Sequence, residues 1–131
     1  MLRNMGGLAF NVAGYQAGVD PRSLALGDVT GDGLADLVIA SHDSAQILVL
    51  ANIGAGSFAP LGSIALGALK PQGVIIARLN ADALFDIAAS TGNNGVEFVS
   101  VSLNQGGGAF VGATSFATGG LDSSFLCAAD M

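Results

Sequence analysis

The stretch GDVTGDGLAD at residues 27–36 decides the fold that we expect, because a degenerate copy of it follows fifty residues later. That copy is ARLNADALFD at residues 77–86, and a third copy begins with Ala129 and Asp130. A fixed internal period is the signature of a repeat architecture, in which each repeat is one supersecondary unit. We therefore interpret the chain as a tandem array of one unit.

A second landmark recurs in the same array. The turn reads NIGAGSF at residues 52–58 and NQGGGAF at residues 104–110, and a related turn, NMGGLAF, lies at residues 4–10. Asn and Gly tolerate the positive φ angles that tight hairpin turns require. Each of these segments is therefore predicted to be a hairpin turn that follows an apolar strand.

Short apolar runs between these turns and acidic loops are predicted to be strands. The expected strands are 23–28, 36–41, 46–51, 57–66, 73–78, 86–90, 96–103 and 109–117, with partial copies at 9–17 and 124–129. Four short strands in each unit are typical of a β-propeller blade. The predicted fold is all-β, with about two and a half tandem four-stranded antiparallel blades and almost no helix.

The repeat also predicts how the chain divides. Residues 1–131 form one repeat array, with a partial blade at 1–18, a blade with a complete acidic loop at 19–68, a blade with a degenerate loop at 69–118 and the start of a further blade at 119–131. A propeller closes with about four to eight blades. We therefore expect either self-association or the remainder of a longer propeller to complete the array, and the sequence leaves open whether the chain is a fragment.

These features together resemble the FG-GAP/VCBS repeat family, the blade type of integrin α-subunit propellers. The resemblance rests on residues 21–37 and on the turns at 56–58 and 108–110. It implies a Ca²⁺ ion in the acidic loop between the first two strands of a blade. By this resemblance the ligands are the side chains of Asp28, Thr30, Asp32 and Asp36 and the backbone carbonyl of Leu34.

The chemistry of the loop agrees with that assignment. Calcium takes six to eight oxygen ligands, and alternate loop positions can converge on it where a glycine such as Gly33 lets the backbone turn. Thr30 departs from the family pattern, since a hydroxyl is a weaker ligand than a carboxylate. An EF-hand is excluded because its twelfth loop position would be Ile39 instead of Glu. The remaining alternative is a metal-free turn held by side-chain hydrogen bonds.

The second loop, with Asn80, Asp82 and Asp86, departs further from the pattern. Arg78 replaces the first aspartate and Ala83 replaces the glycine. We expect this loop to bind no metal, with the Arg78 guanidinium paired to one of its carboxylates in place of a cation.

Composition excludes several classes of function. The net charge is −6 and the four basic residues are scattered, whereas nucleic-acid binding needs clustered Lys and Arg. No apolar run is long enough for a membrane-spanning helix, and no signal peptide is encoded in this chain. No catalytic set is evident, and His42 is expected to be an exposed turn residue instead of a ligand or base.

We therefore expect a non-enzymatic calcium-binding repeat module, located outside the cell or at its surface, that interacts with a protein or glycan in adhesion. The alternative is a structural protein that assembles with itself into a ring or filament, with calcium as a stabilising staple. Enzymatic activity on a propeller scaffold is the least favoured interpretation.

Overall fold

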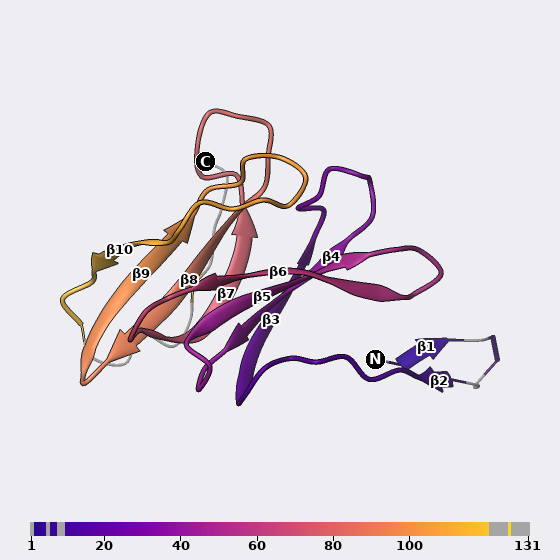
Figure 1. Cartoon of the computed structure of the whole chain (residues 1–131), viewed down its shortest axis with the longest axis horizontal. Coiled ribbons are helices and arrows are strands. Elements are labelled where there is room, and N and C mark those ends of the chain that lie inside the picture. Colours follow the sequence, from indigo (N-terminus) through magenta and orange to yellow (C-terminus); the bar gives the residue numbers. More distant parts are fainter. Residues whose placement is uncertain (1, 5, 8–9, 121–125, 127–131) are drawn as a thin grey trace.

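The computed structural model describes the whole chain except residues 1, 5, 8–9, 121–125 and 127–131. Its described part contains two four-stranded antiparallel sheets and a small two-stranded sheet, and no helix (Figure 1). The prediction of an all-β chain of tandem four-stranded units is confirmed. Neither large sheet closes on itself, so the array is open. Among the described residues no helix has the length and apolar character needed to cross a membrane.

The first large sheet has the strand order β3-β4-β5-β6. Its strands are β3 (Pro21–Gly27), β4 (Asp36–Ser41), β5 (Gln46–Asn52) and β6 (Phe58–Ala65). The second has the order β10-β9-β8-β7. Its strands are β7 (Lys70–Ala77), β8 (Asp86–Asn93), β9 (Val96–Ser102) and β10 (Thr114–Ala117). Strands that follow one another in the chain are therefore neighbours in each sheet, as short turns between antiparallel strands require.

Two expected strands are much shorter in the structure, whereas β7 begins three residues earlier and β8 ends three residues later than expected. The strand expected at 109–117 is reduced to β10, and before it only one isolated bridge joins Phe110 to Asn104. Three consecutive glycines in the preceding turn explain the shortening, since Gly weakens a strand. The strand expected at 9–17 is limited to β2 (Phe10–Val12), which pairs with β1 (Leu2–Asn4). Apart from Leu126, the strand expected at 124–129 lies outside the described residues.

The main core lies between the two large sheets. All six residues of β4 are buried, and alternate side chains of this strand reach opposite faces, as the pleat of a strand dictates. Val38 and Ala40 face the second sheet and belong to one apolar cluster with Val74, Ile87 and Ala89. This packing holds the two sheets face to face.

Small residues on β3 allow the second sheet to approach closely. Ala25 packs at the edge of the core cluster, and Gly27 lies against Ile76 of β7. A β-carbon at Gly27 would lie 3.0 Å from the Ile76 Cγ2 atom, a distance tighter than most real contacts. The inner strands β3 and β7 are therefore in direct contact because one of them presents almost no side-chain volume there.

A second apolar cluster covers the other face of the first sheet. It contains Leu37, Ile39, Leu50 and Phe58, and Tyr15 packs against it from the segment before β3. The Tyr15 and Phe58 rings meet edge to face with centroids 5.6 Å apart, and the Phe58 N–H donates to the Tyr15 hydroxyl at 3.3 Å. Tyr15 thus ties the N-terminal segment to the outer part of this face.

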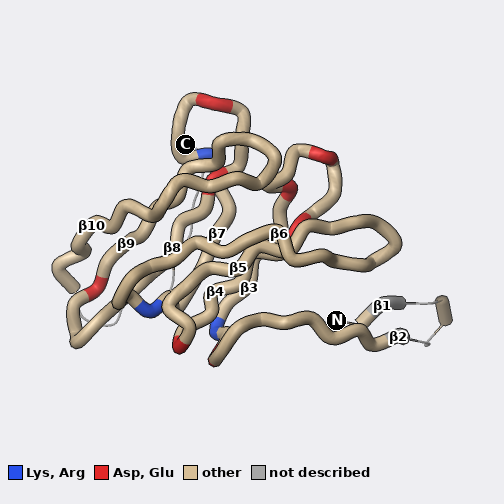
Figure 2. Tube along the Cα trace, in the orientation of Figure 1, with Lys and Arg blue, Asp and Glu red and all other residues tan. Residues whose placement is uncertain are grey.

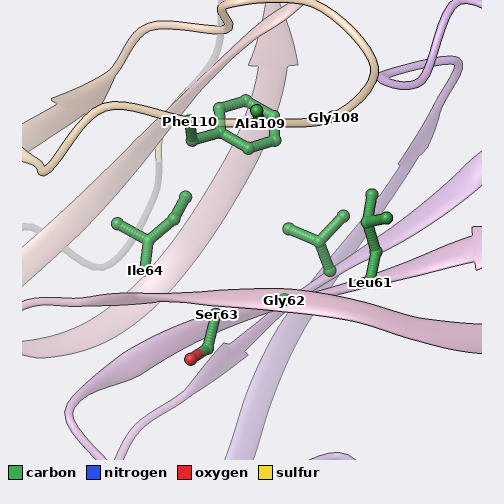
Figure 3. Close-up of a pocket in the computed structure, with 8 residues that line it drawn as sticks. Leu61, Gly62, Ser63, Ile64, Gly108, Ala109 and Phe110 are labelled. Atoms are coloured by element: carbon green, nitrogen blue, oxygen red, sulfur yellow. The ribbon is translucent and has the colours of Figure 1, made fainter.

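The outer ends of the two sheets leave a pocket of about 250 Å³ between them. Leu61 and Ile64 of β6 reach into it from one side, and the Phe110 ring lies across from them, whereas Ser63 points away (Figure 3). Gly108 lies so close to Leu61 that a β-carbon there would meet the leucine side chain at 2.4 Å. The Gly-rich turn thus permits contact between the sheets at this end.

Charged residues gather at the two ends of the sheets and leave the middle nearly free of charge (Figure 2). Both acidic loops lie at one end, where they join β3 to β4 and β7 to β8 (Figure 1). At the other end, Lys70 Nζ contacts Asp43 Oδ1 at 2.8 Å and His42 Nδ1 contacts the same oxygen at 3.0 Å. The expectation that His42 is exposed is wrong, because only 12% of its side chain is accessible between Asp20 and Asp43.

We predict that the core between the sheets carries much of the stability. Replacing Ile47, which is 1% exposed in this core, by Ala should lower the free energy of unfolding by about 2–4 kcal/mol because it leaves a cavity. The matched control is Ile53→Ala at a side chain that is 64% exposed, where the change should stay within about 0.5 kcal/mol. Urea unfolding of both variants measures the difference, and equal losses would contradict the packing described.

Candidate metal centre

The first acidic loop is organised around the Asp28 carboxylate. Its Oδ1 atom accepts hydrogen bonds from the Gly31 N–H at 2.7 Å and the Asp32 N–H at 3.1 Å. Its Oδ2 atom accepts one from the Gly33 N–H at 2.8 Å. Gly31 and Gly33 have φ angles of 83° and 86°, a left-handed conformation that glycine adopts at little cost. The two glycines therefore let successive N–H groups turn inward to the carboxylate.

These hydrogen bonds also change the acidity of Asp28. Partial desolvation raises its pKa, but the N–H groups of Gly33, Gly31 and Asp32 together outweigh that effect and hold the pKa below its ordinary value. Hydrogen bonds to the charged form of a carboxyl group act in this direction. The backbone of the loop therefore favours the ionised form of Asp28, which is the form that a metal ligand needs.

Asp36 closes the loop from the first residue of β4. The carboxylate is completely buried, and its Oδ2 atom accepts hydrogen bonds from the N–H groups of Val29 at 2.9 Å and Thr30 at 3.0 Å. Its Oδ1 atom accepts one from the Asn52 N–H at 2.8 Å. Asn52 in turn donates from Nδ2 to the Ala35 carbonyl at 2.9 Å. We call this arrangement of Asp36 and Asn52 the first Asp–Asn bracket.

The other expected ligands lie on the outside of the loop. Asp32 is exposed, and its Oδ1 atom accepts the Leu34 N–H at 2.8 Å, while no described residue forms a hydrogen bond with its Oδ2 atom. The Thr30 hydroxyl lies 3.5 Å from Asp28 Oδ1. In the part of the chain that the structure describes, only Asp20, His42 and Asp43 form a set of three metal-ligating side chains within 4.8 Å of one another. The structure thus places Asp28, Asp32 and Asp36 on one loop but does not bring their oxygens to that separation.

The donor set nevertheless fits a hard cation. Three carboxylates lie within nine residues, and none of them forms an ion pair with a Lys or Arg among the described residues. Within the described residues Asp32 Oδ2 has no hydrogen-bond partner, and Asp28 Oδ2 and Asp36 Oδ1 each accept one hydrogen bond, so each retains capacity for a further partner. Strands flank the loop on both sides, as expected for a blade and unlike an EF-hand.

The second loop lacks the arrangement around Asp28. Asn80 and Asp82 bond to each other, with Asn80 Nδ2 donating to Asp82 Oδ2 at 2.8 Å and the Asp82 N–H donating to Asn80 Oδ1 at 3.1 Å. Neither Ala81 nor Ala83, at the positions of the two loop glycines, has a positive φ angle. The backbone of this loop therefore does not turn its N–H groups toward one carboxylate.

Arg78 does not pair with the carboxylates of the second loop. The expectation of an ion pair with Asp82 or Asp86 is wrong, since the ion pairs of the described residues involve only Asp20 and Asp43 as acids. The Arg78 guanidinium carbon lies 5.1 Å from the centre of the Phe85 ring instead. A cation over an aromatic face is stabilised by the ring quadrupole. Arg78 thus covers Phe85, and the absence of metal from this loop stays a prediction.

The second sheet nonetheless repeats the Asp–Asn bracket. Asp86 is completely buried and accepts hydrogen bonds from the N–H groups of Leu79 at 2.9 Å and Asn104 at 2.8 Å. Asn104 donates from Nδ2 to the Phe85 carbonyl at 2.9 Å and also to the Val29 carbonyl of the first sheet at 2.8 Å. Sequence reasoning treated both asparagines only as turn residues, although each follows its aspartate at a similar spacing, 16 residues for Asn52 and 18 for Asn104, which was a usable signal.

The group of Asp20, His42 and Asp43 at the opposite end is an ion-pair network. The Lys70 ammonium group, followed by His42, holds the pKa of Asp43 below its ordinary value. Arg22 Nε contacts Asp20 Oδ2 at 2.9 Å. Each carboxylate therefore already has a cationic partner, and we assign no metal to this group.

The two brackets give a prediction about stability. Asn104→Ala should lower the free energy of unfolding by about 1–3 kcal/mol more than Asn52→Ala, because only Asn104 is fully buried and bonded to the other sheet. Asn52 is the matched control, since it makes the same bonds within its own sheet. Chemical denaturation of both variants measures the difference. Equal losses would show that the bond to Val29 contributes nothing.

Comparison with known proteins identifies the repeat. Residues 28–89 match the family model described as FG-GAP-like repeat, a segment that contains both acidic loops. The searches of curated proteins and of solved structures found no significant match. The part of the chain that carries the two acidic loops is therefore similar to the FG-GAP-like repeat family.

Proposed function

We propose that this chain is a non-enzymatic, calcium-binding FG-GAP module that serves as an interaction scaffold outside the cell. The observation that carries the proposal is the loop at 28–36. It presents three carboxylates without any Lys or Arg partner among the described residues, on a backbone already held in shape by hydrogen bonds. Such uncompensated negative charge on hard oxygen donors favours a divalent cation.

The proposed ligands are those that the family resemblance assigns. Asp28 and Asp32 would supply carboxylate oxygens, Thr30 its hydroxyl and Leu34 its carbonyl. Asp36 would contribute through the Oδ1 atom, whose remaining capacity is small because the carboxylate already accepts three backbone N–H groups. When bound, the ion would neutralise the loop charge and stiffen the junction between β3 and β4.

This donor set suits an extracellular setting. A site with a hydroxyl among its ligands and one carboxylate mostly engaged elsewhere should be weak. Extracellular modules bind calcium with Kd values of about 10⁻⁴–10⁻³ M, close to the calcium level around cells. The loops at this end of the sheets would then bind a protein or glycan, since connecting loops vary without cost to a core.

A calorimetric titration with CaCl₂ tests the metal site. The chain should bind one ion, and Asp32→Asn should weaken binding at least tenfold because it removes a charged oxygen donor. Asp82→Asn, the same change at the matching position of the second loop, should leave affinity unaltered. At a calcium concentration ten times Kd, the free energy of unfolding should rise by about 1.4 kcal/mol. Two bound ions, or equal effects of both variants, would contradict the assignment.

The backbone of the loop gives an independent test. Gly33→Ala should weaken calcium binding, because a side chain at a φ of 86° is strained by about 1–2 kcal/mol and the N–H group would turn away from Asp28. Gly62→Ala is the control, since Gly62 lies in β6 with open space around it and without a positive φ. If both variants bind calcium like the parent chain, the shape of this loop does not govern the site.

A further inference from the structure

The turn between β8 and β9 has a sequence that occurs nowhere else in the chain. It consists of Asn94 and Gly95, and Asn94 is the only asparagine of the sequence that precedes a glycine. Their φ angles of 52° and 78° are both positive, as a type I′ hairpin turn requires. Both residues are exposed, and a β-carbon at Gly95 would meet no atom within 4 Å. The backbone and the side chain of this turn are therefore open to water.

Hydrogen bonding leaves the reactive groups of this turn without a partner. No described residue forms a hydrogen bond with the Asn94 side chain or with the Gly95 N–H. The strands pair only up to Asn93 and Val96, on the inner side of the turn. In contrast, the side-chain amide of Asn52 is held by a carbonyl group at 2.9 Å. The Asn94 amide and the Gly95 nitrogen can thus meet by a local movement of the turn.

The first acidic loop provides an internal reference for this geometry. Asp32 is the only aspartate of the sequence that precedes a glycine. There the Gly33 N–H donates to Asp28 Oδ2 at 2.8 Å, and Asp32 Oδ1 accepts the Leu34 N–H at 2.8 Å. Both the backbone nitrogen and the side chain of this pair are therefore tied to other groups, although Asp32 is as exposed to solvent as a loop residue can be expected to be.

We propose that Asn94 is a site of spontaneous modification, at which the Gly95 nitrogen converts the asparagine to aspartate or isoaspartate and thereby weakens the β8–β9 hairpin. The Gly95 nitrogen bonds to the Asn94 Cγ atom and loses its proton, while the side-chain nitrogen leaves with that proton as ammonia. Water then opens the resulting cyclic imide at either carbonyl. No electrons are exchanged, so water is the only co-reactant. The proposal goes beyond the metal site and does not depend on it.

The residue types and the turn act on the reaction in opposite directions. Glycine has no side chain that could obstruct the approach of its own nitrogen, and asparagine is among the thermolabile residues. The ordered turn slows the reaction, because Asn94 must rotate out of its left-handed conformation before Cγ reaches the Gly95 nitrogen. The folded chain should therefore react more slowly than the unfolded chain, but faster at Asn94 than at any other asparagine.

The products do not fit the hairpin as well as asparagine does. Isoaspartate carries the backbone through the side chain and so adds a carbon atom to the turn, whereas the length of the turn sets the register of β8 with β9. Either product also adds a negative charge close in sequence to Glu97 of β9. That side chain is only 8% exposed, and its Oε2 atom has no hydrogen-bond partner among the described residues. Both effects favour opening of the hairpin.

The site is separate from the proposed metal centre. Both acidic loops lie at one end of the sheets, and the turn between β8 and β9 lies at the other end of the second sheet (Figure 1). Modification of Asn94 should therefore leave calcium binding unaltered.

Prolonged incubation of the whole chain in mildly alkaline buffer, with calcium removed by chelation, tests the proposal. Circular dichroism confirms that the chain stays folded, and a parallel sample is unfolded in urea. Peptide mass spectrometry, with fragmentation that distinguishes isoaspartate from aspartate, should find both products at Asn94 before any other asparagine reacts. An Asn94 that stays intact in the folded chain after the unfolded sample has reacted would overturn the proposal.

The Asp32→Asn variant supplies the matched control, because it places a second asparagine before a glycine. In the folded chain the introduced amide should react about ten to a hundred times more slowly than Asn94, since the hydrogen bond from the Gly33 N–H to the charged Asp28 must break first. In urea the two amides should react at similar rates. Equal rates in the folded chain would show that hydrogen bonding does not select the site.

The effect on the hairpin has its own readout. Asn94→Gly keeps a residue that tolerates a positive φ but removes the side-chain amide. After incubation the urea midpoint of the parent chain should fall, and that of Asn94→Gly should not change. Equal losses in both chains would overturn the role of Asn94 in weakening the hairpin. Because calcium is absent throughout, a failure of the proposed metal site would leave these results unaffected.

Discussion

The buried carboxylates of Asp36 and Asp86 are the constraint on which this end of the molecule depends. A buried charge is costly unless hydrogen bonds replace its water, and each of these groups accepts backbone N–H groups from both sides. On one side these N–H groups belong to the acidic loop that precedes the second strand of each sheet. On the other side they belong to the asparagine at the turn that follows the third strand, Asn52 or Asn104. The carboxylate therefore fixes two connections at once, and Asn104 extends the second bracket to the carbonyl of Val29 in the neighbouring sheet.

The Asp–Asn brackets hold the strands together by hydrogen bonds that do not require a cation. The second loop has lost the first aspartate and the loop glycines, yet Asp86 still accepts the Asn104 N–H and Asn104 still donates to the carbonyl before Asp86, as Asp36 and Asn52 do in the first sheet. A unit can thus lose the residues that we propose as ligands and still hold its strands together. The first loop differs by turning additional N–H groups onto Asp28, a geometry that needs Gly31 and Gly33 and that serves no purpose in the bracket itself.

Local patterns predicted the strands well because turns and apolar runs act over short distances. The bounds of β4 are those expected, and both acidic loops join the first two strands of their sheets. Local sequence patterns could not predict contacts between segments that are far apart in the chain. The position of Arg78 over Phe85, the cover of His42 by Asp20 and the burial of Asp36 depend on how sheets and loops meet in space. The family resemblance therefore predicted Asp36 as a ligand and gave no sign of its structural role.

The same difference between local and distant information applies to Leu24 and Leu26 of β3, which are exposed. A single exposed leucine says little, since folded proteins carry much apolar surface. Leu24 and Leu26 gain meaning because Val74 and Ile76, at matching positions, are packed in the core of the same molecule. A strand whose side chains suit a sheet-to-sheet contact keeps that property whether or not the contact is made.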